Sequence, residues 1–317
     1  MIITRFAPAP TGYLHLGHVL SAIHVWGMAR AGGGRVLLRI EDHDRQRSRA
    51  EFESAILEDL DWLGFQPDEA PVRQSERGAI YTSALDRLRA AGLVYACECS
   101  RADIAQAVAR LRAEAVATGA ARRRQGFGGP PELPEKTELR HNPDIEEELR
   151  YPGTCAIKHV AERPGLGVRV RLAPGAESFV DLRHGPQTQR PSEQCGDLLV
   201  KDRDGNWTYQ FVATVDDDVQ GVNLVIRGDD LLESTGRQIQ LARLLGRREP
   251  PEVFHHALVM KTPTQKLSKS DGDTGVRELR AAGWRAPAVI GHAAFLGGLT
   301  PTSRPIAATE LSSMIGR

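Results

Sequence analysis

Two segments far apart in the chain carry side chains suited to binding a nucleotide phosphate. Residues 5–18 read R-F-A-P-A-P-T-G-Y-L-H-L-G-H and place His15 and His18 around Gly17, where a loop enters a predicted helix. A helix N-terminus offers N–H groups and a favourable dipole to an anion, and a glycine lets a ligand approach the backbone. Residues 266–270 read K-L-S-K-S, in which Lys266 and Lys269 supply compact positive charges. Alone, these segments would fit a surface histidine pair and a solvated turn; together they favour an ATP site.

The elements around the first segment alternate between strand and helix. Apolar residues recur at helical spacing after residue 16, and Gly32 to Gly34 end that helix. Ser48 and Glu51 form a possible capping box for the next helix. This order predicts a Rossmann-type, doubly wound parallel sheet. The expected strands are 2–6 and 36–40, and the expected helices are 16–31, 48–63 and 76–91.

The alternation breaks near Tyr95 and resumes near Asp197, which predicts an insertion between them. Within it we expect a helix over 101–118, a glycine- and proline-rich loop over 122–134, and strands over 168–172 and 178–183. The α/β pattern resumes over 197–201, 209–215 and 224–226, a helix follows over 236–245, and the rest is expected to be mostly helical. The predicted units are 1–95 and 196–235 (two halves of a catalytic domain), 96–195 (insertion) and 236–317 (small helical unit).

The two phosphate-binding segments resemble the HIGH and KMSKS motifs of class I aminoacyl-tRNA synthetases. That resemblance implies attack by an amino-acid carboxylate on the α-phosphate of ATP, with Mg²⁺ bound to the nucleotide. Positive donors stabilise the charge that grows on the phosphate oxygens. The resemblance implies His15, His18, Lys266 and Lys269 as catalytic residues, and His15, Gly17, His18 and Lys269 as the ATP-binding set.

Three charged residues at predicted strand ends could bind an acidic amino acid: Arg5, Glu41 and Arg227. Strand ends of an open α/β sheet are where ligands bind, and arginine holds a carboxylate in bidentate fashion. They could instead form structural ion pairs. Segments 5–8, 39–42, 209–217 and 226–230 resemble the glutamyl-type synthetases. This likeness implies that Glu41 holds the ammonium of glutamate, and that Arg5, Ala7, Ala9, Tyr209 and Arg227 bind the rest.

The cysteine spacing favours a structural metal site. Cys97 and Cys99, with Cys155 further along, offer three thiolates to a tetrahedral Zn²⁺. They resemble the zinc site of truncated glutamyl-tRNA synthetase paralogues, which implies Tyr151 as the fourth ligand; His159 is a chemically ordinary alternative. Three buried free thiols would also fit the pattern. Cys195 lies apart and is expected in the core.

Composition limits the partners. The formal net charge is zero, so any nucleic acid must be held by a local patch rather than an overall basic field. Arg110, Arg112 and residues 122–124 could contact tRNA phosphates, although a solvated face is the more ordinary interpretation. The first residues show no basic-then-apolar pattern, so we expect no leader peptide, and no apolar run is long enough to span a bilayer. We therefore expect a cytoplasmic, monomeric protein without a membrane partner.

Two features indicate which branch the chain resembles most. Full-length glutamyl-tRNA synthetases carry an asparagine four positions after the site tyrosine, where this chain has Ala213. They also carry a large helical anticodon-binding region, and with 47 residues after Ser270 we expect none here. The resemblance is therefore closest to the glutamyl-Q tRNA(Asp) synthetase family. It implies ATP, L-glutamate and queuosine-containing tRNA(Asp) as partners. The glutamate is activated without tRNA and transferred to the queuosine base in the anticodon loop. The alternatives are a minimal glutamyl-tRNA synthetase that charges the 3′ end, and an inactive synthetase-like tRNA-binding protein.

Overall fold

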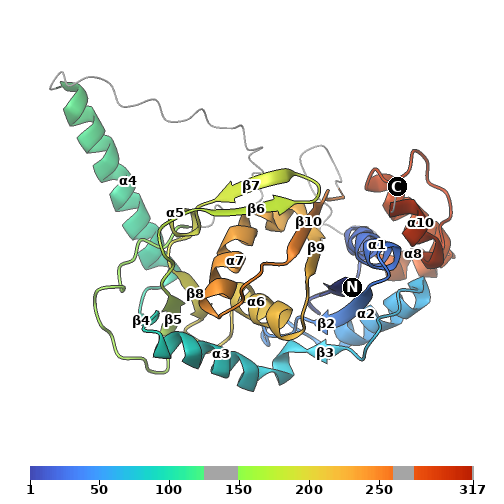
Figure 1. The fold of residues 1–317 in the computed structure, drawn as a ribbon, viewed down its shortest axis with the longest axis horizontal. Coiled ribbons are helices and arrows are strands. Elements are labelled where there is room, and N and C mark those ends of the chain that lie inside the picture. The colour runs from blue at the N-terminus through green and yellow to red at the C-terminus, as the bar shows by residue number, and fades with distance from the viewer. Residues whose placement is uncertain (125–148, 260–274, 316–317) are drawn as a thin grey trace.

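The computed structural model describes residues 1–124, 149–259 and 275–315. Figure 1 shows a mixed α/β body from which one long helix, α4 (Arg101–Arg124), extends away. Arg110 and Arg112 lie on this helix and are exposed. No helix among the described residues is both long enough and apolar enough to cross a bilayer.

Parallel strands from distant parts of the chain meet in the middle of the molecule. Strand β1 pairs in parallel with β2, with Ile3 opposite Arg35, and β2 pairs in parallel with β3. On the other side of β1, the Asn223 N–H donates to the Ile3 carbonyl at 3.0 Å, just before β9. Strand β9 pairs in parallel with β10, and β10 with β6. The predicted parallel arrangement is thus confirmed, although strand pairing divides it into two sheets, with the orders β1-β2-β3 and β6-β10-β9, which meet beside β1. The strands are β1 (Ile3–Phe6), β2 (Arg35–Ile40), β3 (Val72–Arg73), β6 (Glu177–Asp181), β9 (Leu224–Gly228) and β10 (Glu252–His256).

The predicted insertion contributes to two sheets. Its hairpin of β6 and β7 (Gly185–Gln189) joins the parallel strands through β10, so this part hydrogen-bonds directly with the body of the molecule. A separate antiparallel sheet has the order β4-β5-β8 and carries Cys97 at the end of its first strand. Its strands are β4 (Val94–Cys97), β5 (Gly167–Val170) and β8 (Leu198–Lys201).

Helices pack on the sheets through two large apolar clusters. One joins β1, β2 and β9 to α1 and to the C-terminal helices, and includes Ile23, Trp26 and Val289. The other joins β5 and β8 to α3, α6 and α7, and includes Leu85, Phe211 and Leu241. Each such buried side chain contributes about 1.5–3 kcal/mol. The helices are α1 (Leu16–Ala31), α2 (Ala50–Leu63), α3 (Gly78–Ala90), α5 (Pro191–Gln194), α6 (Tyr209–Val219), α7 (Thr235–Leu244), α8 (Val276–Ala281), α9 (Ala286–Leu296) and α10 (Leu311–Ile315), with 3-10 turns η1 (Gln74–Glu76), η2 (Asp229–Ser234) and η4 (Ala308–Glu310).

Two local predictions are wrong. Helix α2 begins at Ala50 after Arg49, without a side-chain cap, and Ser48 Oγ has no hydrogen-bond partner among the described residues, so the predicted capping box does not form. Residues 252–256 form β10 rather than helix, because pairing with β9 and β6 satisfies their backbone groups. Of the predicted loop over 122–134, residues 122–124 belong to α4 and the rest lies outside the described residues.

A buried ion network connects α6 to β1 and β2 and to the segment that contains η1 and α3. Asp217 accepts hydrogen bonds from Arg5 of β1 at 3.0 Å and from Arg39 of β2 at 2.8 Å. Its neighbour Asp216 accepts from Arg77 at 2.7 Å, and from Gln74 and Tyr81 at 2.8 Å each. Burial alone would raise the pKa of Asp217, but the two guanidinium groups beside it hold that pKa below its usual value. The Asp217 carboxylate therefore stays ionised, and the network holds α6 against β1, β2 and α3.

We predict that Asp216→Asn lowers the free energy of unfolding by about 3 kcal/mol, because removing one partner of a buried ion pair leaves the other charge uncompensated. Urea unfolding at neutral pH measures this loss of stability. Asp218→Asn is a matched control, since Asp218 lies next but one in sequence and only reaches Arg247 at 3.8 Å on a part-exposed surface; about 0–1 kcal/mol is expected. Equal losses in the two variants would contradict a structural role for the buried network.

Candidate active site

A cavity of about 550 Å³ opens at the carboxyl ends of the parallel strands. Its walls come from the ends of β1, β2, β9 and β10 and from the first turns of α1 and α6. The chain leaves β1 toward β2 on one side, and β9 lies on the other side, so the cavity sits at a topological switch point. This is the usual position of a ligand in an open α/β sheet. The lining residues include Arg5, His15, Gly17, His18, Glu41, Tyr209 and Arg227 from the predicted site.

The two histidines cap α1 reciprocally. His15 Nδ1 accepts the Gly17 N–H, and His18 Nδ1 accepts the His15 N–H, both at 3.1 Å. Their ring centroids lie 3.9 Å apart. Because each Nδ1 is an acceptor, a neutral ring carries its proton on Nε2. The cap therefore fixes the tautomer of both rings at the edge of the cavity and presents two donors beside the helix N-terminus.

The capping geometry explains why position 17 is a glycine. A Cβ at Gly17 would lie 2.9 Å from Cε1 and 3.0 Å from Nδ1 of His15. Such a side chain would displace the His15 ring from its cap. From the sequence, a glycine was expected here because it lets a ligand approach the backbone. Gly17 also lines the cavity, so both reasons apply.

Arg5 and Glu41 lie on neighbouring strands and are both almost fully buried. Arg5 donates to Asp217 and, at 3.2 Å, to the Ile226 carbonyl. Glu41 accepts from Arg39 at 3.4 Å. Burial raises the pKa of Glu41, although Arg39 and Arg5 oppose this effect. A bound cation would therefore favour the ionised form of Glu41.

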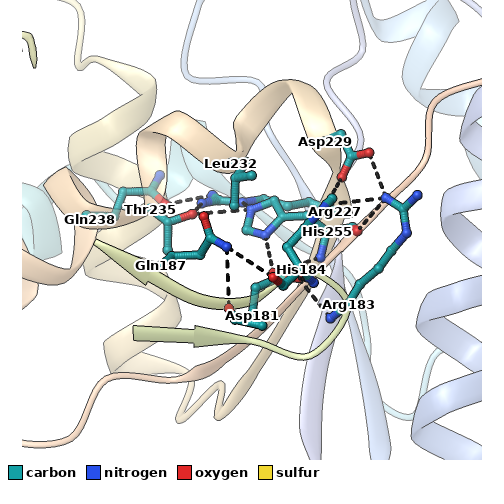
Figure 2. Close-up of polar contacts among 12 residues, drawn as sticks. Asp181, Arg183, His184, Gln187, Arg227, Asp229, Leu232, Thr235, Gln238 and His255 are labelled. Atoms are coloured by element: carbon teal, nitrogen blue, oxygen red, sulfur yellow. Dashed lines mark hydrogen bonds and ion pairs between the residues drawn. The ribbon is translucent and has the colours of Figure 1, made fainter. Parts of the chain in front are cut away.

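Arg227 is held by neutral partners (Figure 2). Its Nε donates to His255 Nε2 at 2.9 Å, and its two terminal nitrogens donate to Gln238 at 2.6 Å and Thr235 at 2.9 Å. Within the described chain it has no carboxylate partner. Burial lowers the pKa of Arg227, so an anionic ligand would relieve the cost of keeping this charge inside the protein.

Other predicted glutamate-site residues divide into two groups. Ala7 and Tyr209 line the cavity, and burial, with Glu41 nearby, raises the pKa of Tyr209, so that its hydroxyl remains a donor. Ala9 is not among the lining residues of the described chain. Ala213 lies one turn along α6 from Tyr209 and is buried.

Lys266 and Lys269 lie outside the described residues. The residues that flank the gap are placed, however. Val259 lines the cavity, and Gly275 forms an isolated antiparallel bridge with His15, reinforced by a 2.9 Å hydrogen bond from Val276 N to the Leu14 carbonyl. Both ends of the segment that carries the two lysines thus lie at the same cavity.

The sulfur atoms of Cys97, Cys99 and Cys155 all lie within 4.8 Å of one another. Arg169 donates to Cys97 Sγ at 3.4 Å. Burial, with a hydrogen bond to Cys155, raises the pKa of Cys99 to about 12. Among the described residues, these three sulfurs form a group close enough together to hold a metal ion. Cysteine sulfurs are common ligands of Zn²⁺.

Tyr151, rather than His159, approaches this cluster. The Tyr151 hydroxyl lies 3.5 Å from Cys97 Sγ and accepts the Cys155 N–H at 2.8 Å. Arg169 stacks over its ring at 3.7 Å. His159 is exposed and does not belong to the cluster. Cys195 is also outside it, with its thiol donating to the Pro191 carbonyl at 3.2 Å.

Sequence reasoning missed several residues at or behind the cavity. Ser21, Leu231, His256 and Leu258 line it, and no sequence signal separated them from ordinary core positions. Gly228 also lines it and lies in the segment 226–230 that the resemblance had indicated. Arg39 and Asp217 do not line it but hold Arg5 and Glu41. The acidic pair at 216 and 217, inside an otherwise apolar helix, was a signal that could have indicated a buried ion network.

Comparison with known proteins identifies the family. The family model described as tRNA synthetases class I (E and Q), catalytic domain, matches residues 1–305. Proteins named glutamyl-Q tRNA(Asp) synthetase include one from Symbiobacterium thermophilum, 38% identical over 98% of this chain and 91% of its own length. Another, from Rhodobacter capsulatus, is 39% identical over 89% of this chain and 96% of its own length.

A solved structure gives the same answer for the fold. A glutamate tRNA ligase from Elizabethkingia meningosepticum, crystallised in complex with its amino acid, has a TM-score of 0.72 and 26% identity; the match covers 98% of this chain. The chain spans 64% of that ligase. The extent of the family model and the identity to these relatives show that the chain belongs to the glutamyl and glutaminyl branch of the class I aminoacyl-tRNA synthetases, a family of ligases.

Proposed function

We propose that this chain activates L-glutamate with ATP, without tRNA, and transfers it to the queuosine base in the anticodon loop of tRNA(Asp). The charge inventory of the cavity carries the first half of the proposal. Among the buried charged side chains of the described residues that line it or touch a lining residue there, Arg5 is paired with Asp217 and Arg39 with Glu41, whereas the hydrogen-bond partners of Arg227 are neutral. Glutamate, which carries two carboxylates and one ammonium, would supply the anionic partner that Arg227 lacks among the described residues.

The same inventory assigns the parts of glutamate. Glu41, whose pKa burial raises, would bind the ammonium, and Arg5 and Arg227 would bind the carboxylates. Tyr209 would donate its hydroxyl from the first turn of α6. Ala7 and Ala9 would shape the loop after β1, where a small side chain leaves room for the ligand. Glutamine lacks the second negative charge and would leave Arg227 uncompensated.

Nucleotide binding would use the N-terminus of α1. The Nε2–H groups of His15 and His18, together with Lys266 and Lys269, would meet the phosphates, and Gly17 would allow close approach of the nucleotide. A glutamate carboxylate oxygen forms a bond to the α-phosphorus while the bond to the β-phosphate oxygen breaks, and pyrophosphate leaves. Mg²⁺ would accompany ATP and neutralise the departing phosphates.

The choice of acceptor rests on the relatives, since proteins named glutamyl-Q tRNA(Asp) synthetase match this chain along most of their length. A hydroxyl of the queuosine cyclopentene-diol would attack the glutamyl carbonyl, and AMP would leave. Ala213, in place of the asparagine of full-length glutamyl-tRNA synthetases, agrees with this acceptor. We also propose that the chain is a cytoplasmic monomer built from the units expected from its sequence: 1–95 with 196–235, 96–195, and 236–317.

We also propose that Cys97, Cys99, Cys155 and Tyr151 hold one structural Zn²⁺. The proximity of the three sulfurs and of the Tyr151 hydroxyl supports it. Bound zinc would cross-link β4 to the segment around residues 151–155, which otherwise has little regular structure.

Glutamate-dependent ATP–pyrophosphate exchange without tRNA tests the activation step. We expect exchange with glutamate and at least about 100-fold less with glutamine or aspartate, because only glutamate satisfies both arginines. Exchange that starts only when tRNA is added would favour the minimal 3′-charging synthetase. No exchange under either condition would favour the inactive tRNA-binding protein.

Lys269→Ala should reduce exchange by more than about 100-fold while leaving the melting temperature unchanged, because its charge is needed as the phosphate charge grows. Lys158→Ala is the control, since Lys158 forms an exposed ion pair with Glu98 and should keep full activity. Turnover near the wild-type rate in the Lys269 variant would refute the assignment of the K-L-S-K-S segment.

Cys155→Ser should lose the metal and lower the melting temperature, since the loss of one thiolate opens the tetrahedral site. Elemental analysis of protein purified without added metal, followed by thermal unfolding, measures both effects. Cys195→Ser is the matched control, because its buried thiol lies outside the cluster and donates to the Pro191 and Gly196 carbonyls. About one zinc per wild-type chain is expected; a wild-type protein without bound metal would contradict the proposal.

A further inference from the structure

Behind Arg227 lies a row of two further buried side chains, His255 and Asp181, which do not line the cavity (Figure 2). His255 of β10 has its ring between Arg227 of β9 and Asp181 of β6. All three are at least 95% buried. The row crosses the three adjacent strands β9, β10 and β6 and ends at the turn of the β6–β7 hairpin.

The hydrogen bonds fix the direction of every donor in this row. Arg227 Nε can only donate, so His255 Nε2 must accept, at 2.9 Å. The His255 proton therefore lies on Nδ1, which donates to Asp181 Oδ2 at 2.7 Å. The same oxygen accepts the His255 N–H at 3.1 Å. Burial, with Arg227 nearby, lowers the pKa of His255 to about 4, so the ring is neutral near pH 7.

Asp181 is itself held from behind. Its Oδ1 accepts the N–H groups of Arg183 at 2.9 Å and His184 at 2.8 Å, so the hairpin turn fixes the orientation of the carboxylate. The hairpin turn is also bonded to η2, because the side chains of Arg183 and His184 both contact Asp229 at 2.7 Å. The position of Asp181 is thus set by the fold and not by the ligand.

We propose that His255 and Asp181 are positioning residues that orient the Arg227 guanidinium for glutamate and keep its charge available to the ligand carboxylate. This inference rests on the proposed function. A carboxylate in direct contact with Arg227 would compete with the substrate for that charge. A neutral ring fixes the guanidinium plane without neutralising it, and the carboxylate behind it imposes the required tautomer.

The arrangement makes Asp181→Asn informative. The two turn N–H groups would retain the amide oxygen, which turns the amide nitrogen toward His255. His255 Nδ1 would then have to accept and Nε2 would carry the proton, opposing the Arg227 Nε–H donor to donor. The isosteric change should therefore displace Arg227 without removing any atom from the cavity wall.

The experiment compares three variants by exchange kinetics and by calorimetric titration with glutamate. His255→Leu and Asp181→Asn should raise the glutamate KM about 10- to 100-fold, the scale of one lost hydrogen bond to a charged group, and leave the ATP KM within about twofold. His255→Gln keeps an acceptor near the Nε2 position and should recover most of the affinity. Thr188→Val, which alters an exposed contact with Ser178 on the same hairpin, is the matched control and should match wild type.

A glutamate KM within about threefold of wild type in both His255→Leu and Asp181→Asn would overturn the proposal. So would an equal rise of the glutamate and ATP KM values, or a His255→Gln variant no better than His255→Leu, because either indicates general damage to the fold. Failure of the proposed function looks different: wild-type protein would neither exchange nor bind glutamate, and both proposals would fall. Thermal unfolding identifies any variant that does not fold, and the proposal is then judged on the variants that do fold.

Discussion

The buried carboxylates of α6 are the constraint on which the site depends. Asp217 joins Arg5 of β1 to Arg39 of β2, and Asp216 reaches Arg77, Gln74 and Tyr81. These partners lie more than 130 residues from α6 in the sequence. Burying charges is costly unless they are paired and hydrogen-bonded. The network therefore requires α6 to dock in one position, and that position sets Tyr209, Arg5 and Glu41 around one cavity.

The remaining binding groups are oriented in the same manner, by neighbours rather than by a ligand. His15 and His18 cap each other at the start of α1, and Arg227 is held by neutral partners on β10 and α7. Donors whose direction is set in advance need little reorganisation when charge develops on a substrate, which is the main source of electrostatic catalysis. The cost is a buried guanidinium, that of Arg227, without a carboxylate partner among the described residues, and a substrate carboxylate would supply one.

The sequence predicted the elements that carry strong local signals. The apolar spacing after residue 16 and the strand at 36–40 predicted α1 and β2, and their order predicted the parallel sheet. It also predicted that Arg5, Glu41 and Arg227 lie together at strand ends, and all three line the cavity. The capping box at Ser48 failed because Ser48 lies outside the first turn of α2, and β10 was missed because its register depends on β9 and β6.

Other features depend on contacts that no local pattern encodes. The reason for glycine at position 17 is the His15 ring that packs over it, and the role of His255 appears only when β6 and β10 lie side by side. The preference for Tyr151 over His159 at the cysteine cluster likewise depends on how the chain between 151 and 159 folds back on β4. Long-range pairing, rather than composition or spacing, decides each of these points.

The most direct measurement of the central claim is the position of labelled glutamate on tRNA(Asp). Purified protein, ATP and radiolabelled glutamate would be incubated with queuosine-containing tRNA(Asp) and with the same tRNA lacking queuosine, and each product digested into anticodon and 3′ fragments. Label is expected in the anticodon fragment of the queuosine-containing tRNA and not in the tRNA that lacks queuosine. Label on the 3′-terminal adenosine of both tRNAs would contradict it and identify a 3′-charging enzyme.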